Sequence, residues 1–200
     1  MKWLVAALVL WPWAVLAEGF PALYDVSGVA RDDVLNIRQG PGANHPIFGA
    51  FGPFQTEIEV TGEAAETGWL RVNLGEGIGW VSPQFMTRTG PDWQGGMPER
   101  YACFGSEPFW LLHVNGATAS WQDPEIGARR YTQSEQGPSV HVPDMMAARF
   151  EADAANRVTA LITQRSCSDG MSDRAYGLGA TLIRDAAQTQ IMQGCCSIAP

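Results

Sequence analysis

The chain has 200 residues, with 13 Lys or Arg against 21 Asp or Glu, and a net charge of −8. Lys2 is the only lysine of the sequence, so every later cation is an arginine. Such an acidic chain argues against nucleic acid as a partner, because phosphate binding draws on dense clusters of cations. It likewise argues against anionic lipid surfaces.

The first 17 residues, MKWLVAALVLWPWAVLA, have the pattern of a secretory signal peptide. Lys2 precedes an apolar run, and small residues occupy the −3 and −1 positions of a cleavage point after Ala17. The run is short for a membrane-spanning helix. We therefore expect a periplasmic or secreted protein with no membrane span after cleavage. Retention of the segment as an anchor stays open, because Pro12 is unusual in a signal peptide.

Residues 24–87 contain short runs of alternating polar and apolar residues, separated by Gly, Pro and Asn. The runs at 35–38, 56–62, 68–75 and 77–82 are each typical of a β-strand. In the second run, Ile58 and Val60 share one face while Glu57 and Glu59 take the other. Because no stretch keeps a helical period, this segment predicts a small all-β barrel.

These runs together resemble a bacterial SH3-like domain, whose recurring plan is L-N-[VI]-R-x-G-P-G, a hydrophobic strand, a W-x-x-V strand and a closing G-W-V. The residues that match the plan are Leu35, Asn36, Ile37, Arg38, Gly40, Pro41, Gly42, Trp69, Val72, Gly79, Trp80 and Val81. The family mostly serves as a targeting or binding module for cell-wall peptides and other envelope ligands. The resemblance therefore implies binding of a peptide or cell-wall component rather than a reaction.

Tyr24, Trp69 and Trp80 offer stacking faces with few charges, which suits a peptide-binding groove. The loop RQGPGANHP at 38–46 would border this groove, with Arg38 and His45 as candidate contacts. Its glycines and prolines indicate a tight turn first of all. A structural hydrogen bond from Arg38 to a carbonyl or carboxylate is the favoured explanation of that residue, and a ligand contact is the alternative.

Residues 88–98, RTGPDWQGGMP, lack periodicity and are typical of a linker. Strand patterns return in 99–200, at 108–114, 117–122, 138–142, 147–152, 157–166, 177–185 and 189–194. Hairpin turns are expected at 153–156 and around 186–187. The segment 144–155 has an alternative as a helix, since Met, Ala and Glu favour that state. The second domain is predicted to be an antiparallel barrel of about eight strands.

All four cysteines, Cys103, Cys167, Cys195 and Cys196, lie in this second domain. An even number of cysteines in an exported chain predicts two disulfides. Cys195 and Cys196 point to opposite faces of one strand, so each is expected to pair with one of the two distant cysteines. Which of them pairs with which stays open. Paired thiols would leave no cysteine nucleophile for a peptidase mechanism.

The run CSDGMSD at 167–173 crowds oxygen ligands into a short loop, although too few for calcium on their own. The same residue types satisfy backbone donors in turns, which is the favoured explanation. We keep Asp169 and Asp173 as candidate ligand-binding residues. Soft copper ligands are also present, but they form no cluster, so core packing is expected of Met145, Met146, Met171 and Met192. No cofactor or metal site is predicted.

The motifs EPFW (107–110), CSDGMSD (167–173) and GCC (194–196) resemble a set of bacterial envelope proteins and lipoproteins. That resemblance carries no activity. The sequence as a whole predicts an exported, non-catalytic binding protein of the cell envelope. An envelope enzyme (a cell-wall hydrolase or redox protein) and a metal-handling periplasmic protein are the alternatives, and the oligomeric state is left open.

Overall fold

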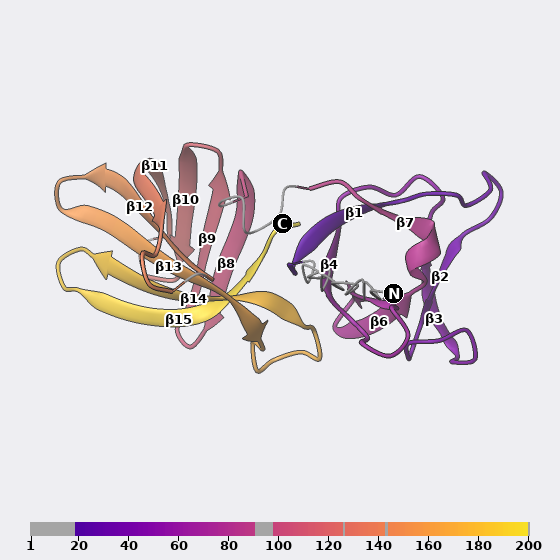
Figure 1. Ribbon diagram of the computed structural model, residues 1–200. Helices are drawn as coiled ribbons and strands as arrows, with labels where there is room; N and C mark the ends of the chain where they lie inside the picture. The colour runs from indigo at the N-terminus through magenta and orange to yellow at the C-terminus, as the bar shows by residue number, and fades with distance from the viewer. Residues whose placement is uncertain (1–18, 91–97, 126, 143, 200) are drawn as a thin grey trace, which may run out of the picture.

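The computed structural model describes residues 19–90, 98–125, 127–142 and 144–199. The described strands form two sheets, the first from strands before residue 91 and the second from strands after residue 97 (Figure 1). The prediction of an all-β chain is confirmed. The signal segment expected at 1–17 and all but the ends of the linker expected at 88–98 lie outside the described residues.

The first sheet has seven strands in the order β3-β2-β6-β5-β4-β1-β7, and all its pairings are antiparallel. Its elements are β1 (Ala22–Val26), β2 (Leu35–Arg38), β3 (Ile47–Phe51), β4 (Ile58–Glu63), β5 (Leu70–Leu74), β6 (Gly77–Val81), the short 3-10 helix η1 (Pro83–Phe85) and β7 (Met86–Arg88). The four strands expected from the sequence are β2, β4, β5 and β6. Figure 1 shows the sheet curling around a single interior.

Along most of these strands every second residue is apolar, and its side chain points into the interior of the sheet. Ile37, Val60, Val72 and Val81 have no exposed surface, and they come from four different strands. β-branched side chains of this kind pack well on a pleated surface, so the sequence pattern and the sheet agree. The outer positions of the same strands are left for contacts with solvent, with a ligand or with the second domain.

The second sheet is a closed barrel of eight strands in the order β10-β11-β12-β13-β14-β15-β8-β9. Its strands are β8 (Arg100–Ser106), β9 (Phe109–Asn115), β10 (Thr118–Asp123), β11 (Gly127–Pro138), β12 (Met145–Asp153), β13 (Asn156–Cys167), β14 (Tyr176–Asp185) and β15 (Gln190–Ser197). Neighbours along the chain are antiparallel hairpins, and β15 closes the ring against β8. The predicted eight-stranded barrel is confirmed.

The strand expected at 147–152 is confirmed as part of β12. The helix alternative for 144–155 is wrong, because Met146, Ala148 and Phe150 are buried at a period of two along this strand. The strand expected at 138–142 lies instead at 127–138 as β11. This strand has a mostly polar sequence with Tyr131 as its only buried residue, so it carries little apolar alternation.

Two disulfides fasten the barrel, as predicted, one on each side of β15. Cys196 pairs with Cys103 in the fully buried core, and Cys195 pairs with Cys167 at the end of β13. The first bridge joins two strands that are already neighbours in the sheet. The second fixes the start of the loop at 168–175 against the outer side of β15.

The two domains are joined by hydrogen bonds that polar side chains form with backbone groups and with each other. Glu59, on the outer side of β4, is buried and accepts hydrogen bonds from the Ser197 hydroxyl and the Ile198 N–H. On β5, Asn73 bonds the backbone of Ala175 in the second domain. Figure 1 shows the C-terminal end of the chain reaching toward β4. These contacts set the first sheet beside the loop at 168–175.

Candidate functional site

A row of outward side chains crosses three neighbouring strands of the first sheet. Trp80 on β6 lies opposite Arg71 on β5 and opposite Arg38 on β2. All three side chains are half-buried, whereas their strand neighbours Leu70 and Val81 are buried. A row with an indole on its middle strand and an arginine on each neighbouring strand is suited to planar and anionic parts of a ligand.

Both arginines of this row are held in place by backbone oxygens. Arg38 Nη1 donates to the His45 carbonyl at 2.7 Å, and Arg71 Nη2 donates to the Thr61 carbonyl at 3.0 Å. Arg71 Nε also donates to the Thr61 hydroxyl at 3.1 Å. Partial burial lowers the pKa of Arg71, yet a guanidinium stays charged at any physiological pH. The row is thus preorganised and cationic.

The loop at 38–46 is a compact turn that closes on itself. The His45 ring lies so close to Gly40 that a Cβ on this glycine would overlap it at 2.5 Å. Gln39 N–H donates to the Pro46 carbonyl at 3.0 Å, which joins the two ends of the loop. The structural hydrogen bond favoured for Arg38 is present, and it is made to the backbone of this loop. His45 itself is exposed beside the arginine.

The structure places the remaining aromatic candidates of the first domain differently. Trp69 directly precedes β5 and is half-buried, two positions before Arg71 and therefore on the outer side like Trp80. Tyr24 is 5% exposed and belongs to the core of the first domain, so it offers no open stacking face. Arg38, His45, Trp69 and Trp80 thus lie on the outer side, without Tyr24.

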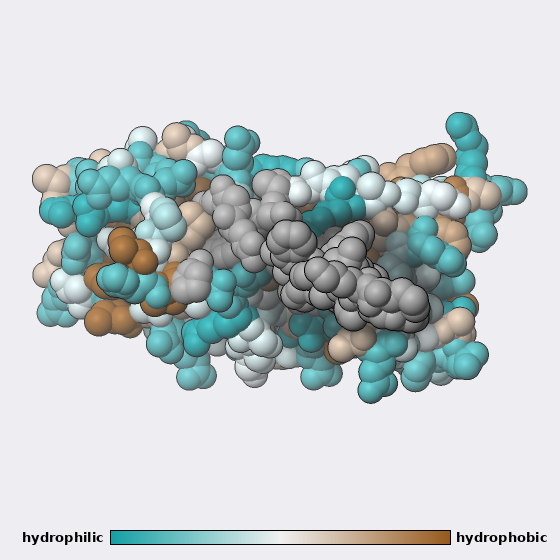
Figure 2. All heavy atoms as spheres, viewed as in Figure 1, coloured by the Kyte–Doolittle hydropathy of each residue, from teal (hydrophilic) through white to brown (hydrophobic). Residues whose placement is uncertain are grey.

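The barrel carries a groove of about 750 Å³ on its side. Its walls come from β8 and β9 near their turn, the end of β10, the end of β13 with the loop after it, and part of β15. They include Phe104, Phe109, Leu111, Met171 and Arg165. Leu111 and Phe104 are cross-strand partners on β9 and β8. The groove thereby brings the EPFW, CSDGMSD and GCC motifs together. Most of the surface seen in Figure 2 is hydrophilic, and its strongest hydrophobic colour lies on the barrel half.

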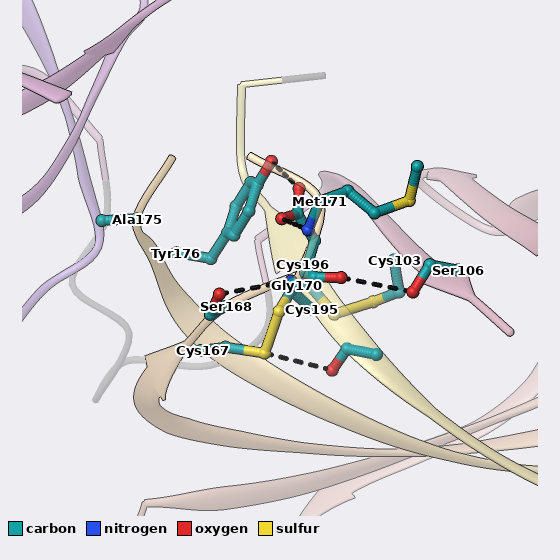
Figure 3. The surroundings of a disulfide bond; sticks show 12 residues. Cys103, Ser106, Cys167, Ser168, Gly170, Met171, Ala175, Tyr176, Cys195 and Cys196 are labelled. Atoms are coloured by element: carbon teal, nitrogen blue, oxygen red, sulfur yellow. Dashed lines mark hydrogen bonds between the residues drawn. A yellow bond between two sulfur atoms is a disulfide. The ribbon is translucent and has the colours of Figure 1, made fainter. Parts of the chain in front are cut away.

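The CSDGMSD loop forms a tight turn around one carboxylate. Asp169 accepts hydrogen bonds from the Met171 and Ser172 N–H groups, both at 3.0 Å, and from the Ser172 and Tyr176 hydroxyls. Figure 3 shows the Tyr176 ring on one side of this turn and Met171 extending away from the disulfides. Partial burial would raise the pKa of Asp169, but these hydrogen bonds outweigh it and lower the pKa. The carboxylate is therefore ionised and already occupied.

Asp173, the second candidate of the loop, is exposed and takes a different position. Its backbone N–H donates to the Glu76 carbonyl of the first domain at 2.9 Å. Asp169 faces the groove while Asp173 and Ala175 face the first domain, so the two carboxylates do not form one site. Within residues 19–90, 98–125, 127–142 and 144–199, no group of three His, Cys, Asp or Glu side chains could hold a metal ion.

The groove was not foreseen from the sequence. Met171 is 67% exposed, although core packing was expected of it, and Phe109 is 58% exposed. Met146 and Met192, in contrast, are buried as expected. The small neighbours Gly170 and Ser172 on the two sides of Met171 are a weak signal of its exposure. No helix of the described segments is long and apolar enough to cross a membrane.

The comparisons with known proteins identify one part of the chain. Residues 33–87 match the family described as the bacterial SH3 domain. Nothing matches in the comparisons with curated proteins and with solved structures. The match covers the strands that carry Arg38, Trp69, Arg71 and Trp80, and it ends before the barrel. The resemblance of the barrel to bacterial envelope proteins stays a prediction.

Proposed function

We propose that the protein is an exported, non-catalytic binding protein of the cell envelope that recognises carboxylate-bearing peptides, such as those of the cell wall, through its SH3-like domain. The observation that carries the proposal is the row of Arg38, Trp80 and Arg71 on the outer side of β2, β6 and β5. The family match at 33–87 supports a binding module.

The chemistry of the row explains why a peptide with carboxylates is suited to it. The indole of Trp80 supplies an apolar face, and the arginines of the two neighbouring strands supply charge-assisted donors for carboxylate oxygens. The hydrogen bonds to His45 and Thr61 use one of the five N–H groups of Arg38 and two of those of Arg71. Both groups are therefore fixed in place and retain donors for a ligand.

The two disulfides of the barrel are consistent with an exported protein. All four cysteines are paired, and disulfides persist mainly in oxidising compartments. The signal pattern at 1–17 points to the same destination. A cysteine nucleophile would require reduction of one of the two bridges, which is why the proposal is one of binding and not of thiol chemistry.

The proposal is tested by co-sedimentation of the purified protein with isolated peptidoglycan. Trp80→Ala and Arg38→Gln are expected to lower retention at least tenfold, because each removes one face of the row. Phe54→Ala is the matched control, since Phe54 is an exposed aromatic of the same domain, outside the row. Equal retention of all four proteins, or no retention of the unchanged protein, would contradict the proposal.

A further inference from the structure

The groove on the barrel is a recess with a largely apolar wall, and the SH3-like face does not use it. Its volume of about 750 Å³ lies within the roughly 300–1,000 Å³ that small-molecule sites occupy. Phe109, Leu111 and Met171 expose 58%, 37% and 67% of their surface there. Large apolar side chains left open to water beside a recess mark a binding surface.

The anionic groups of the groove are already engaged. Asp169 is surrounded by donors of its own loop. Asp123 accepts a hydrogen bond from the Trp121 indole at 2.6 Å and forms a buried ion pair with Arg184 at 3.2 Å. A ligand cation would therefore meet carboxylates whose lone pairs are largely occupied. The acidic residues of the groove do not favour a cationic ligand.

The cationic side chain of the groove, Arg165, differs from these carboxylates because none of the described residues engages it. Arg165 is exposed, and within the described part of the chain its guanidinium forms no hydrogen bond or ion pair. Its side chain lies across Gly179 on the neighbouring strand β14, where any Cβ would displace the guanidinium. Gly179 thus lets the guanidinium rest on the outer face of the barrel, beside Cys167 and the apolar wall. The remaining polar side chains are uncharged; they are Ser106, Gln122, Ser168 and Gln193.

We infer that this groove binds a small amphipathic carboxylate, with an acyl chain along Phe109, Leu111 and Met171 and its carboxylate on Arg165. An acyl chain forms no hydrogen bonds along its length. It therefore suits an apolar wall whose few polar side chains are mostly hydrogen-bonded within the protein. A single uncompensated guanidinium matches a single anionic end. This site belongs to the barrel and does not depend on the function of the SH3-like domain.

The test is a calorimetric titration of the intact purified protein with dodecanoate below its micellar concentration. The expected result is saturable binding of one molecule, about tenfold weaker for decanoate, because two fewer methylene groups are buried. Dodecan-1-ol and dodecyltrimethylammonium keep the chain and change the head group, and both are expected to bind at least tenfold more weakly. A hexapeptide with a free carboxyl end is included to distinguish a peptide ligand.

Variants separate recognition from adsorption to an apolar surface. Arg165→Gln and Phe109→Ser are expected to weaken dodecanoate binding at least tenfold, and Arg165→Lys to restore part of it. Arg157→Gln on the same strand, also exposed, and Phe54→Ser in the other domain are the controls. Absence of saturable binding, equal binding of the three head groups, unchanged binding by Arg165→Gln, or tighter binding of the peptide would each overturn the inference.

Discussion

Asn73 and Ala175, which are 102 residues apart, exchange two hydrogen bonds across the domain boundary. Asn73 Nδ2 donates to the Ala175 carbonyl at 2.9 Å, and Ala175 N–H donates to Asn73 Oδ1 at 3.0 Å. The Asn73 amide thus bonds the N–H and the carbonyl of this loop residue in the way that a neighbouring β-strand would. Because Cys167 anchors the same loop to β15, this pair links the first sheet to the disulfide-bonded side of the barrel.

Replacing Asn73 by Ala leaves both backbone groups of Ala175 without this partner. We expect a loss of about 2 kcal/mol in the free energy of unfolding, since two neutral hydrogen bonds contribute about 0.5–1.5 kcal/mol each. Urea denaturation measures it. Asn44→Ala, in an exposed loop of the same domain, is the control and is expected to change little. A loss no larger than that of the control would show that the pair does not stabilise the contact.

Glu59 makes the domain contact sensitive to pH. Burial raises the pKa of Glu59 above its usual 4.5, while hydrogen bonds from Ser197 and Ile198 and the charge of Arg174 oppose the shift. A raised pKa means that the folded state holds the proton more tightly than the unfolded state does. Between the two pKa values, the contribution of Glu59 to stability therefore falls as the pH rises.

Glu59→Gln removes this titration and keeps a similar shape. Relative to the unchanged protein, the variant is expected to gain stability as the pH rises from below 4.5 toward neutrality, with the difference levelling off above the raised pKa. Thermal unfolding of both proteins across this range measures the difference and cancels the titration of surface carboxylates. A difference that does not change with pH, or changes with the opposite sign, would contradict the assignment.

The two disulfides are expected to differ in their contribution to stability. Cys103–Cys196 closes a separation of 93 residues and Cys167–Cys195 one of 28. In the chain-entropy description these loops correspond to about 4.6 and about 3.6 kcal/mol. Paired Cys→Ala variants of each bridge, compared by urea denaturation, are expected to show the larger loss for the buried 103–196 bridge. The reverse order would mean that the outer bridge stabilises the protein through the loop at 168–175.

At Gly194 of the GCC motif, β15 and β8 lie so close together that only a glycine fits. A Cβ at this position would overlap the Phe104 backbone of β8 and lie 2.8 Å from the Trp110 ring. We expect Gly194→Ala to destabilise the barrel by more than about 2 kcal/mol, in the range of an overpacked core. Gly137→Ala on β11 is the control, because a Cβ there meets nothing within 4 Å. A loss equal to that of the control would refute the packing argument.

Much of the fold follows from local patterns in the sequence. Alternation predicted β2, β4, β5 and β6, and the opposite faces of Cys195 and Cys196 predicted two bridges with distant partners. The pairing itself required the register of β15 against β8, which places Cys196 opposite Cys103. Strand β11 was missed because its sequence is mostly polar, so no hydrophobic alternation marks it.

The candidate site was predicted only in part, because burial of a residue depends on distant segments. Arg38 and Trp80 proved to be cross-strand neighbours, whereas Tyr24 lies in a core that its local sequence does not reveal. Arg71, missed from the sequence, completes the row through the register of β5 and β6. Met171 was expected in the core and is exposed, since the loop around Asp169 holds it away from the barrel.

The most direct test of the central claim is an NMR titration of the intact protein with a cell-wall stem peptide. The proposed recognition face predicts saturable shifts of the Trp80 indole N–H and of the Arg38 and Arg71 side-chain signals, with little change at Phe54. Shifts confined to other residues, or a spectrum that does not change at millimolar peptide, would contradict the assignment of this face as the peptide-binding site.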